Sequence, residues 1–378
     1  MATVDQLRRR AQQRKFIIQA VIVAVIVLSI WGAVSSAQTN LTALGITSGF
    51  GFLERATGWG YSFSLIERSI DDTYARTLTI GFLNTLFLGT LCIVLSTIVG
   101  FLIGSIRDST NLALQTLSTT FIQFFRNIPL ILQVVFWYAL LIHMPGPRQA
   151  MSLVEMAFLS NRGLMVPMFN LSVTAALGVG LASAAIAALL FWMRISLAKA
   201  VILWLVGTAL SIAVACFALI PAGEPIVSIP ALKGLRFRGG LELSIELLAM
   251  IIAIVLYSSA YIAEVVRGGL AEVPRGLTEA GQALGMSSRA IWLQIRLPMA
   301  LRSIIPPLGN QWIFVMKATT VGVAIGFSDL FMIVSTSITQ SGQTLELIAI
   351  LMGAFLLVNF TLAQLVNLLN ARLQLKGH

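Results

Sequence analysis

The chain has 378 residues, of which 57% are hydrophobic and only 11% charged, a composition far from that of ordinary soluble domains. Its formal net charge is +10, but the basic residues are spread between apolar runs and form no single patch with interleaved aromatic residues, which argues against nucleic-acid binding. Both cysteines lie inside apolar runs, so neither a disulfide framework nor a cysteine metal site is indicated.

Long apolar runs indicate an all-α membrane protein, a polytopic bundle in which about eight transmembrane helices cross the lipid bilayer. The first run could instead be a signal peptide, because basic residues precede it and small residues follow it, although it is longer than most signal sequences. Residues 109–126 could lie partly in the membrane interface. In chain order, we predict spans at about residues 16–34, 78–105, 121–142, 171–193, 201–221, 242–263, 305–331 and 344–369.

The distribution of Lys and Arg between the loops predicts the orientation of the chain, because positive residues are retained on the cytoplasmic face. Placing the N-terminus in the cytoplasm puts the basic N-terminal cluster and ten further Lys and Arg residues inside. We therefore expect a multi-pass protein of the bacterial inner membrane with both termini cytoplasmic. The predicted outer loops then hold eight basic residues: Arg55, Arg68, Arg76, Arg148, Arg162, Lys233, Arg236 and Arg238.

The apolar runs and the loops between them divide the chain into four predicted parts. No internal repeat is visible, which argues against an inverted-repeat secondary transporter. The parts are a basic cytoplasmic N-terminus (1–15), a first transmembrane helix with a periplasmic loop (16–73), a core (74–331) with extra helices at about 171–221 and a cytoplasmic loop at 264–303, and a last transmembrane helix with a cytoplasmic tail (344–378).

One stretch, residues 264–298, departs from the apolar pattern in the C-terminal half and falls on the predicted cytoplasmic side. Thr278 is a candidate N-cap for a short helix through Leu284, and Gly285 can adopt the left-handed conformation that ends such a helix. Ser287 or Ser288 can then cap a second helix. The sequence therefore predicts a helix, a tight glycine turn and another helix.

The first of these helices begins with Glu279 and continues with small side chains, which would let another protein approach closely. An ordinary amphipathic cytoplasmic loop with a glycine cap would show the same spacing, so helical spacing alone does not decide between the two. The small residues are Ala280, Gly281 and Ala283.

The order Glu279-Ala280-Gly281, then Gly285, then Ile295-Arg296-Leu297-Pro298 resembles the EAA signature of permease subunits of binding-protein-dependent ABC importers. The signature has Glu-Ala-Ala, three free positions, Gly, nine free positions, then Ile, one free position, Leu and Pro, and every spacing is met. Gly281 replaces the usual second Ala, a small-for-small change that lowers helix propensity.

The flanking segments resemble permeases of the polar amino acid, HisMQ-like, family. Three segments carry this resemblance, at residues 125–133, 259–267 and 306–311. Residues 48–53 and the extra spans between about 145 and 240 are similar to the longer subunit of general L-amino-acid importers, the AapQ or BztB type.

The resemblance implies a permease subunit whose loop forms a coupling helix, seated in a groove of a separate ATPase. It implies two ATPase subunits that bind ATP and Mg, a periplasmic amino-acid-binding protein, an amino-acid substrate and a second permease subunit, for which a different chain is favoured over a second copy. The chain has no Gly-x-x-x-x-Gly-Lys-Ser/Thr phosphate loop of its own. The coupling residues are Glu279, Ala280, Gly281, Ala283, Leu284, Gly285 and Met286.

Polar side chains at membrane depth are candidates for the substrate pathway, because a charge at the bilayer centre costs about 2.5 to 3.5 kcal/mol and usually faces a cavity or a partner. An amino-acid zwitterion needs donors for its carboxylate and acceptors for its ammonium group. For Lys317, an interhelical hydrogen bond or ion pair is an equal alternative, and Arg126 could instead snorkel to the cytoplasmic interface. The candidates are Arg126, Asn127, Asn310, Gln311, Lys317, Thr319 and Thr320.

The family usually has Lys-Asp-Thr-Ser or Lys-Asn-Ser-Ser where this chain has Lys-Ala-Thr-Thr at residues 317–320, so a substrate contact through the polar side chain at Ala318 is not carried over. The alternative function is an ion- or proton-coupled secondary amino-acid carrier, which would use buried acids and leave the loop without a role. An intramembrane enzyme would need a nucleophile with its base or a metal cluster, and His143 and His378 form neither. We therefore expect no catalytic residue, no metal site and no cofactor in this chain.

Overall fold

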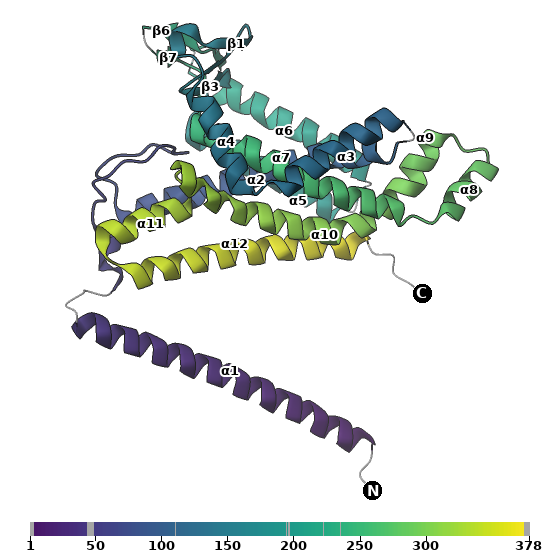
Figure 1. The fold of residues 1–378 in the computed structure, drawn as a ribbon, viewed down its shortest axis with the longest axis horizontal. Helices are drawn as coiled ribbons and strands as arrows, with labels where there is room; N and C mark the ends of the chain where they lie inside the picture. Colours follow the sequence, from purple (N-terminus) through teal and green to yellow (C-terminus); the bar gives the residue numbers. More distant parts are fainter. Residues whose placement is uncertain are drawn as a thin grey trace.

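The computed structural model describes residues 4–43, 49–109, 111–193, 195, 197–221, 223–234 and 236–373 (Figure 1). The end of the predicted tail, with His378, lies outside these residues. Six described helices are long and apolar enough to cross a membrane, and up to eight spans result if each of two bent pairs is one span. The predicted helical membrane bundle is thus confirmed. The six helices are α1 (Val4–Ala43), α2 (Tyr74–Arg107), α5 (Val173–Trp192), α6 (Leu197–Leu219), α7 (Ile245–Ala271) and α12 (Thr344–Leu373).

Two bent helix pairs supply the seventh and eighth spans if each pair counts as one span. The first pair is α3 (Leu112–Asn127) with α4 (Leu130–Ile142), bent by 100°. The second joins α11 (Leu330–Ser341), at a bend of 49°, to the run formed by α9 (Ser288–Ile291), the π-helical turn η3 (Trp292–Arg296), α10 (Leu297–Ala318) and the 3-10 turn η4 (Thr319–Ile325).

The predicted span at residues 121–142 is therefore broken, at Pro129. Because α3 and α4 are bent by 100°, they cannot both run along the membrane normal. Proline lacks a backbone donor and leaves carbonyl groups of the preceding turn without partners. The Gln133 side-chain amide occupies two of these carbonyls, donating to the oxygens of Phe125 (2.9 Å) and Ile128 (3.0 Å). These two carbonyls are thus bonded inside the protein.

The predicted span at residues 305–331 also differs from the structure. Its helical run begins earlier, at Ser288, and the α-helix ends at Ala318. Gly326, with a φ of 73°, then reverses the chain in the left-handed region. The buried Asp329 side chain caps α11, a helix that the sequence analysis did not predict. The glycine and the capping aspartate together end one helix and begin the next.

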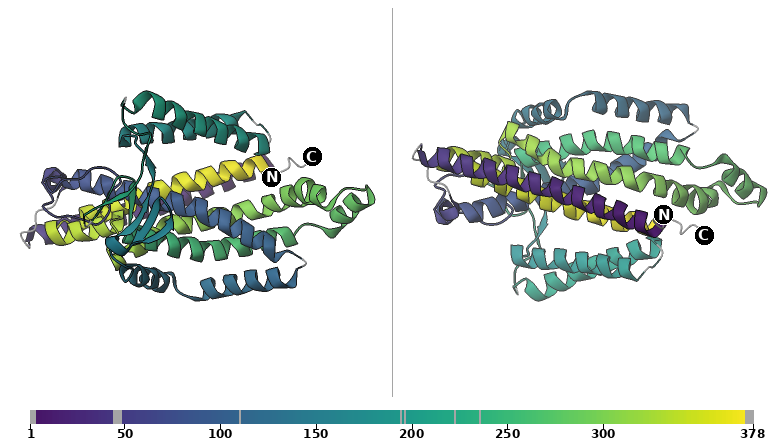
Figure 2. Two further views of the ribbon diagram at one scale, coloured as in Figure 1. Left: turned by 90° about the horizontal axis from the view of Figure 1, so that it is seen from above. Right: turned by 90° about the horizontal axis from the view of Figure 1, so that it is seen from below.

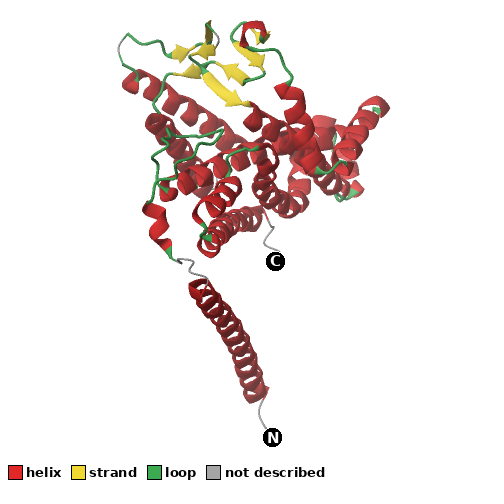
Figure 3. Ribbon diagram, turned by 60° about the vertical axis from the view of Figure 1, so that its left-hand side comes forward, coloured by secondary structure: helices red, strands yellow, loops and turns green. Residues whose placement is uncertain are grey.

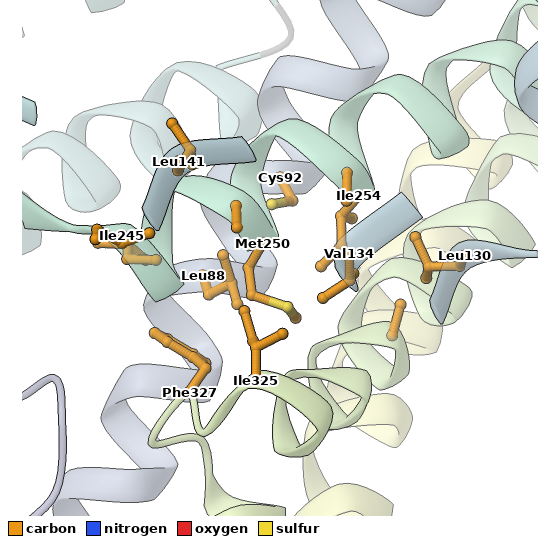
Figure 4. Close-up of a cluster of buried hydrophobic side chains, with 14 of the residues drawn as sticks. Leu88, Cys92, Leu130, Val134, Leu141, Ile245, Met250, Ile254, Ile325 and Phe327 are labelled. Carbon is orange, nitrogen blue, oxygen red and sulfur yellow. The ribbon is translucent and has the colours of Figure 1, made fainter. Parts of the chain in front are cut away.

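An apolar cluster at the centre of the bundle joins α2, α4 and α7 to the segment around η4 (Figure 4). Helices α2 and α7 approach closely because α2 has glycines at the contact. A Cβ atom at Gly100 would lie 2.6 Å from Cβ of Ile262, and one at Gly104 would lie 2.6 Å from the carbonyl oxygen of Ala263. The cluster includes Leu88, Cys92, Leu130, Val134, Leu141, Ile245, Met250, Ile254, Ile325 and Phe327.

Short antiparallel strands, which were not predicted from the sequence, occur along the chain between α4 and α7 and gather at one edge of the molecule (Figure 3). Glu242, the predicted start of the sixth span, lies in the last strand. On one face of the four-stranded sheet β1-β2-β3-β8, Leu159 and Leu243 pack against the central cluster. On the other face, Phe158 stacks on Phe237 of a separate hairpin. The elements are η2 (Pro147–Gln149), β1 (Met151–Val154), β2 (Ala157–Ser160), β3 (Gly163–Val166), β4 (Met168–Phe169), β5 (Val227–Ser228), β6 (Ala231–Lys233), β7 (Arg236–Arg238) and β8 (Leu241–Ser244).

Helices α5 and α6 lie where the sequence predicts extra helices, at about residues 171–221, and form a hairpin set to one side of the bundle (Figure 2). They pack mainly against each other. The Ser183 and Thr208 hydroxyl groups lie 2.9 Å apart, and the Trp204 indole donates to the Ser183 carbonyl at 3.2 Å. These polar contacts fix the pairing of two otherwise apolar helices.

The segment before α2, which begins with the 3-10 turn η1 (Phe50–Glu54), is bonded to the end of the bundle through Asn84. The amide of this buried side chain donates to the carbonyl oxygens of Phe63 (3.1 Å) and Ser328 (2.8 Å), and its oxygen accepts from the backbone N–H of Leu65 (3.1 Å). One residue of α2 thus holds the segment against the turn that precedes α11.

The two ends of the described chain lie toward the same end of the molecule. Helix α1 lies apart from the bundle (Figures 1 and 3). Its beginning points to the end at which α12 finishes (Figures 1 and 2). Helix α8 (Arg275–Ala283) projects at this end, whereas the strands lie toward the opposite end. This arrangement is the one expected if both termini and the α8 loop share one side of a membrane.

Candidate coupling loop and substrate pathway

Helix α8 contains most of the predicted coupling residues, but it begins one turn earlier than the sequence suggested. It starts at Arg275 after Pro274, which occupies the cap position without a side-chain hydrogen bond. Thr278, the predicted N-cap, therefore lies inside the helix. Proline has the fixed φ that a helix start requires, so the helix begins after Pro274, four residues before the start that a Thr278 cap would give.

The turn that ends α8 has the predicted left-handed glycine. Gly285 has a φ of 73°, and its N–H donates to the carbonyl oxygen of Gln282 at 2.9 Å. The N–H of Met286 donates to the carbonyl oxygen of Gly281 at 3.1 Å. These two bonds form a Schellman motif. Ser287 then caps α9 by accepting from the N–H of Ala290, so the helix, glycine turn and second helix form one hydrogen-bonded unit.

The predicted coupling residues face two directions. Gly281 is buried, and a Cβ there would lie 3.1 Å from side-chain atoms of both Ile291 and Ile295. It thus serves the packing of α8 on the following helix and does not face outward. Glu279, Ala280, Ala283, Leu284 and Gly285 are exposed, and Met286 is half-buried. Leu284 has 81% of its surface exposed, which is unusual for a leucine at a helix end and suits a contact with another protein.

Ion pairs fasten the base of this loop to the bundle. Glu264 of α7 pairs with Arg107 at the end of α2 and with Arg267, the latter at 2.6 Å. Arg296 of η3 pairs with Asp108 at 2.7 Å. All of these side chains are at least partly shielded from solvent. Glu264 is the first residue of the predicted cytoplasmic loop, and the sequence did not identify its partners.

A row of aromatic rings crosses the bundle from α3 to α10. The guanidinium of Arg126 lies 4.8 Å from the ring centroid of Tyr261, a cation–π contact. Tyr261 and Tyr257 of α7 have ring centroids 4.9 Å apart and hydroxyl oxygens 3.3 Å apart. Tyr257 in turn stacks on Phe314 of α10 at 5.7 Å. Lys317 follows Phe314 by three residues on α10, a spacing that places both on one side of the helix.

The three rings of this row were not among the residues predicted from the sequence. Tyr257 and Tyr261 are spaced four residues apart on an apolar span, a spacing that places both on one helix face, and this was the available signal. Phe314 precedes Lys317 by three residues. Their side chains are partly exposed at membrane depth, which distinguishes them from the buried core.

The other pathway candidates do not all join the row. Thr319 is fully buried, with its hydroxyl bonded to the Met316 carbonyl at 3.1 Å, so it lines no surface in this conformation. The half-buried Thr320 donates to the carbonyl of Lys317 at 2.8 Å. Asn310 instead lines a groove of about 460 Å³ between α10 and α12. Asn127 is exposed at the end of α3, and Gln311 is half-buried on α10.

Lys317 is exposed, and none of the ion pairs among the described residues involves it. Its neighbour Ala318 packs into the central cluster. The described residues contain no group of three or more His, Cys, Asp or Glu side chains placed to hold a metal ion.

Residues 96–375 match the family described as binding-protein-dependent transport system inner membrane component. The chain is 39% identical to YhdX of Escherichia coli, whose name describes an amino-acid ABC transporter permease protein, over 95% of this chain and 94% of the relative. It is 34% identical to the general L-amino acid transport system permease protein AapQ of Rhizobium johnstonii, over 96% of this chain and 92% of the relative.

A third relative is the glutamate/glutamine/aspartate/asparagine transport system permease protein BztB of Rhodobacter capsulatus. It is 30% identical over 96% of this chain and 94% of its own length. These matches confirm the resemblance that the EAA signature and its flanking segments indicated. The chain belongs to the family of binding-protein-dependent transport system inner membrane components, and it is a multi-pass membrane permease of the ABC transporter type.

Proposed function

We propose that this chain is a permease subunit of an ATP-driven importer of L-amino acids in the bacterial inner membrane, with both termini in the cytoplasm. A periplasmic binding protein delivers the substrate, and a second, different permease subunit completes the pathway. Two separate ATPase subunits bind ATP and Mg and hydrolyse the nucleotide. The observation that carries this proposal is the exposed helix α8, held by its Schellman turn at the end of the molecule where the chain termini lie.

The loop is built to pass a displacement into the bundle. The α8–Gly285–α9 unit continues without a break through η3 into α10, the helix that carries Phe314 and Lys317. Closure of the ATPase subunits against Leu284 and its neighbours would therefore move a helix that contributes to the row. The pair Arg296–Asp108 links the same helix to the end of α2, so that both helices respond together.

The aromatic row, Arg126 and Lys317 offer groups that can bind an amino acid as it crosses the membrane. Arg126 and Lys317 can each bind a carboxylate, and the tyrosine rings can bind an ammonium group through cation–π contact. Polar groups at membrane depth need a cavity or a partner, and here they are partly exposed on one subunit. A second permease subunit facing this row would enclose it.

The test is uptake by the complete complex, purified with its ATPase subunits and reconstituted in proteoliposomes with an amino-acid-binding protein. A panel of acidic, polar, basic and aliphatic amino acids identifies the substrates. Uptake should require ATP and the binding protein, and it should persist when a protonophore removes the proton gradient. Uptake that needs the ion gradient and continues without any ATPase would instead establish a secondary carrier. Co-purification of a second permease chain decides between heterodimer and homodimer.

A further inference from the structure

The β6–β7 hairpin presents a face made of cations. In its antiparallel register, Lys233 lies directly opposite Arg236, and Leu232 lies opposite Phe237. Side chains alternate between the two faces along each strand, and directly opposite residues share a face. Lys233, Arg236 and Arg238 therefore point to one side of the hairpin, and Phe237 points to the other.

The contact of Phe237 determines which side faces outward. Its ring stacks on Phe158 of β2 with the centroids 4.9 Å apart. The far face of that sheet packs on the bundle through Leu159 and Leu243. The sheet thus lies between the bundle and the hairpin, and the cations point away from both. Arg148 of η2, which lies beside β7, is also exposed. We name these four exposed residues the basic hairpin patch: Arg148, Lys233, Arg236 and Arg238.

Within the described part of the chain, no ion pair neutralises any residue of this patch. Like charges directly opposite each other on two strands destabilise a hairpin. The pairing of Lys233 with Arg236 thus destabilises the hairpin, and no ion pair with an acidic side chain among the described residues offsets this repulsion. An unfavourable arrangement of exposed residues, such as two like charges paired across strands, is typical of a functional site such as a binding surface.

We propose that the basic hairpin patch docks an acidic surface of the soluble amino-acid-binding protein, an inference that rests on the function proposed above. The patch belongs to the outermost layer of the β structure, toward the end opposite α8, where a soluble carrier would deliver its substrate (Figure 1). Exposed charges at the edge of an interface accelerate encounter and orient the partner, and their effect is screened by salt. The patch therefore sets the rate and orientation with which the loaded binding protein arrives.

The experiment measures binding of the soluble protein that supports uptake by the wild-type complex. The complete complex is placed in nanodiscs, and association is followed from about 50 mM to about 300 mM NaCl. The triple variant K233Q/R236Q/R238Q removes three charges, and R236K/R238K retains them. R55Q is the matched control, because Arg55 is exposed in the predicted outer segment but does not belong to the hairpin. Basal ATP hydrolysis by each complex shows that the variants assemble.

The triple variant should weaken binding by about tenfold, mainly through slower association, and should lose most of the salt dependence of the wild type. R236K/R238K and R55Q should bind as the wild type does. Unchanged binding by the triple variant, or an equal loss in R55Q, would overturn the proposal while leaving wild-type uptake, and hence the proposed function, intact. If the variants change only the stability of the complex, and do so in discs containing phosphatidylglycerol but not in phosphatidylcholine discs, the patch binds anionic lipid. That result would also overturn the proposal. Absence of wild-type uptake with any binding protein would refute the proposed function itself.

Discussion

Substitution of Gly285 tests whether the geometry of the coupling turn determines how efficiently ATP hydrolysis drives uptake. Gly285 has a φ of 73°, and a Cβ atom there would meet no atom within 4 Å. The cost of a side chain therefore comes from the backbone alone. The left-handed conformation costs an L-residue about 1 to 2 kcal/mol, and Asn adopts it more readily than other residues. Gly285→Ala should thus weaken the turn by about 1 kcal/mol, and the β-branched Gly285→Val by about 2 kcal/mol.

The relevant measurement is the number of amino-acid molecules taken up per ATP hydrolysed in proteoliposomes. If the coupling unit works only with this turn intact, a loss of about 1 kcal/mol reduces the population of the native turn relative to its alternatives about fivefold. We expect the ratio to fall in the order Gly, Asn, Ala, Val, with ATP hydrolysis retained. Gly276 provides the matched control, because it lies in α8, the helix that the turn ends, has no positive φ, and has no atom within 4 Å of a Cβ. Gly276→Ala should keep the wild-type ratio, since alanine favours a helix.

Two results would refute this reasoning. If Gly285→Val and wild type transport the same number of molecules per ATP, with equal recovery of the assembled complex, the left-handed turn is not needed for coupling. A loss of the ratio in Gly276→Ala as large as that in Gly285→Ala would show that any change in α8 uncouples the complex, and the argument from φ would then fail.

Three further substitutions test other contacts. Arg296→Ala leaves Asp108 without its partner, and we expect a loss of about 1 kcal/mol at the base of the loop, measured as lower uptake per ATP; the double variant with Asp108→Ala should lose no more than the single one. Gly100→Ala would place a Cβ 2.6 Å from α7 and should cost about 1 to 3 kcal/mol, measured as a lower Tm of the complex in detergent. Tyr261→Leu removes the ring beneath Arg126 and should raise the KM for uptake about fivefold, whereas Tyr261→Phe, which keeps the ring, should change it little; equal effects of the two variants would contradict the cation–π assignment.

The coupling loop was the most predictable region because its signals are local. Glycine is the residue that most readily adopts the left-handed conformation that ends a helix. Gly285 is followed two residues later by the capping Ser287, so the sequence alone predicts the turn. The boundary at Pro274 was missed because Thr278 offers a competing cap within the same turn. The buried position of Gly281 depends on Ile291 and Ile295 of the next helix, a contact that local spacing does not contain.

The aromatic row and the strands were not predicted because each depends on contacts between distant segments. Tyr257 and Phe314 stand 57 positions apart in the sequence and meet only because α7 and α10 pack together. The strands are two to four residues long, shorter than the runs from which alternation can be recognised. Pro129 breaks the span predicted at residues 121–142, and only the folded structure shows that Gln133 donates to the freed carbonyls.

The helical run from α9 through η3 to α10 connects α8 to the aromatic row. It also contains the residues at which a displacement of α8 would change the position of Phe314 in that row. From Ser288 to Ala318 the run is continuous, about 45 Å long at a rise of 1.5 Å per residue. The α-helical hydrogen-bond pattern changes at two places in this run, at the π-helical turn η3 and at Pro306 and Pro307. π-helical turns and prolines are the usual causes of bending in a helix. The prolines lie between the loop and Phe314, beside the groove between α10 and α12. Motion imposed on α8 would therefore bend the run at these residues and move Phe314 relative to Tyr257, which α7 holds in place.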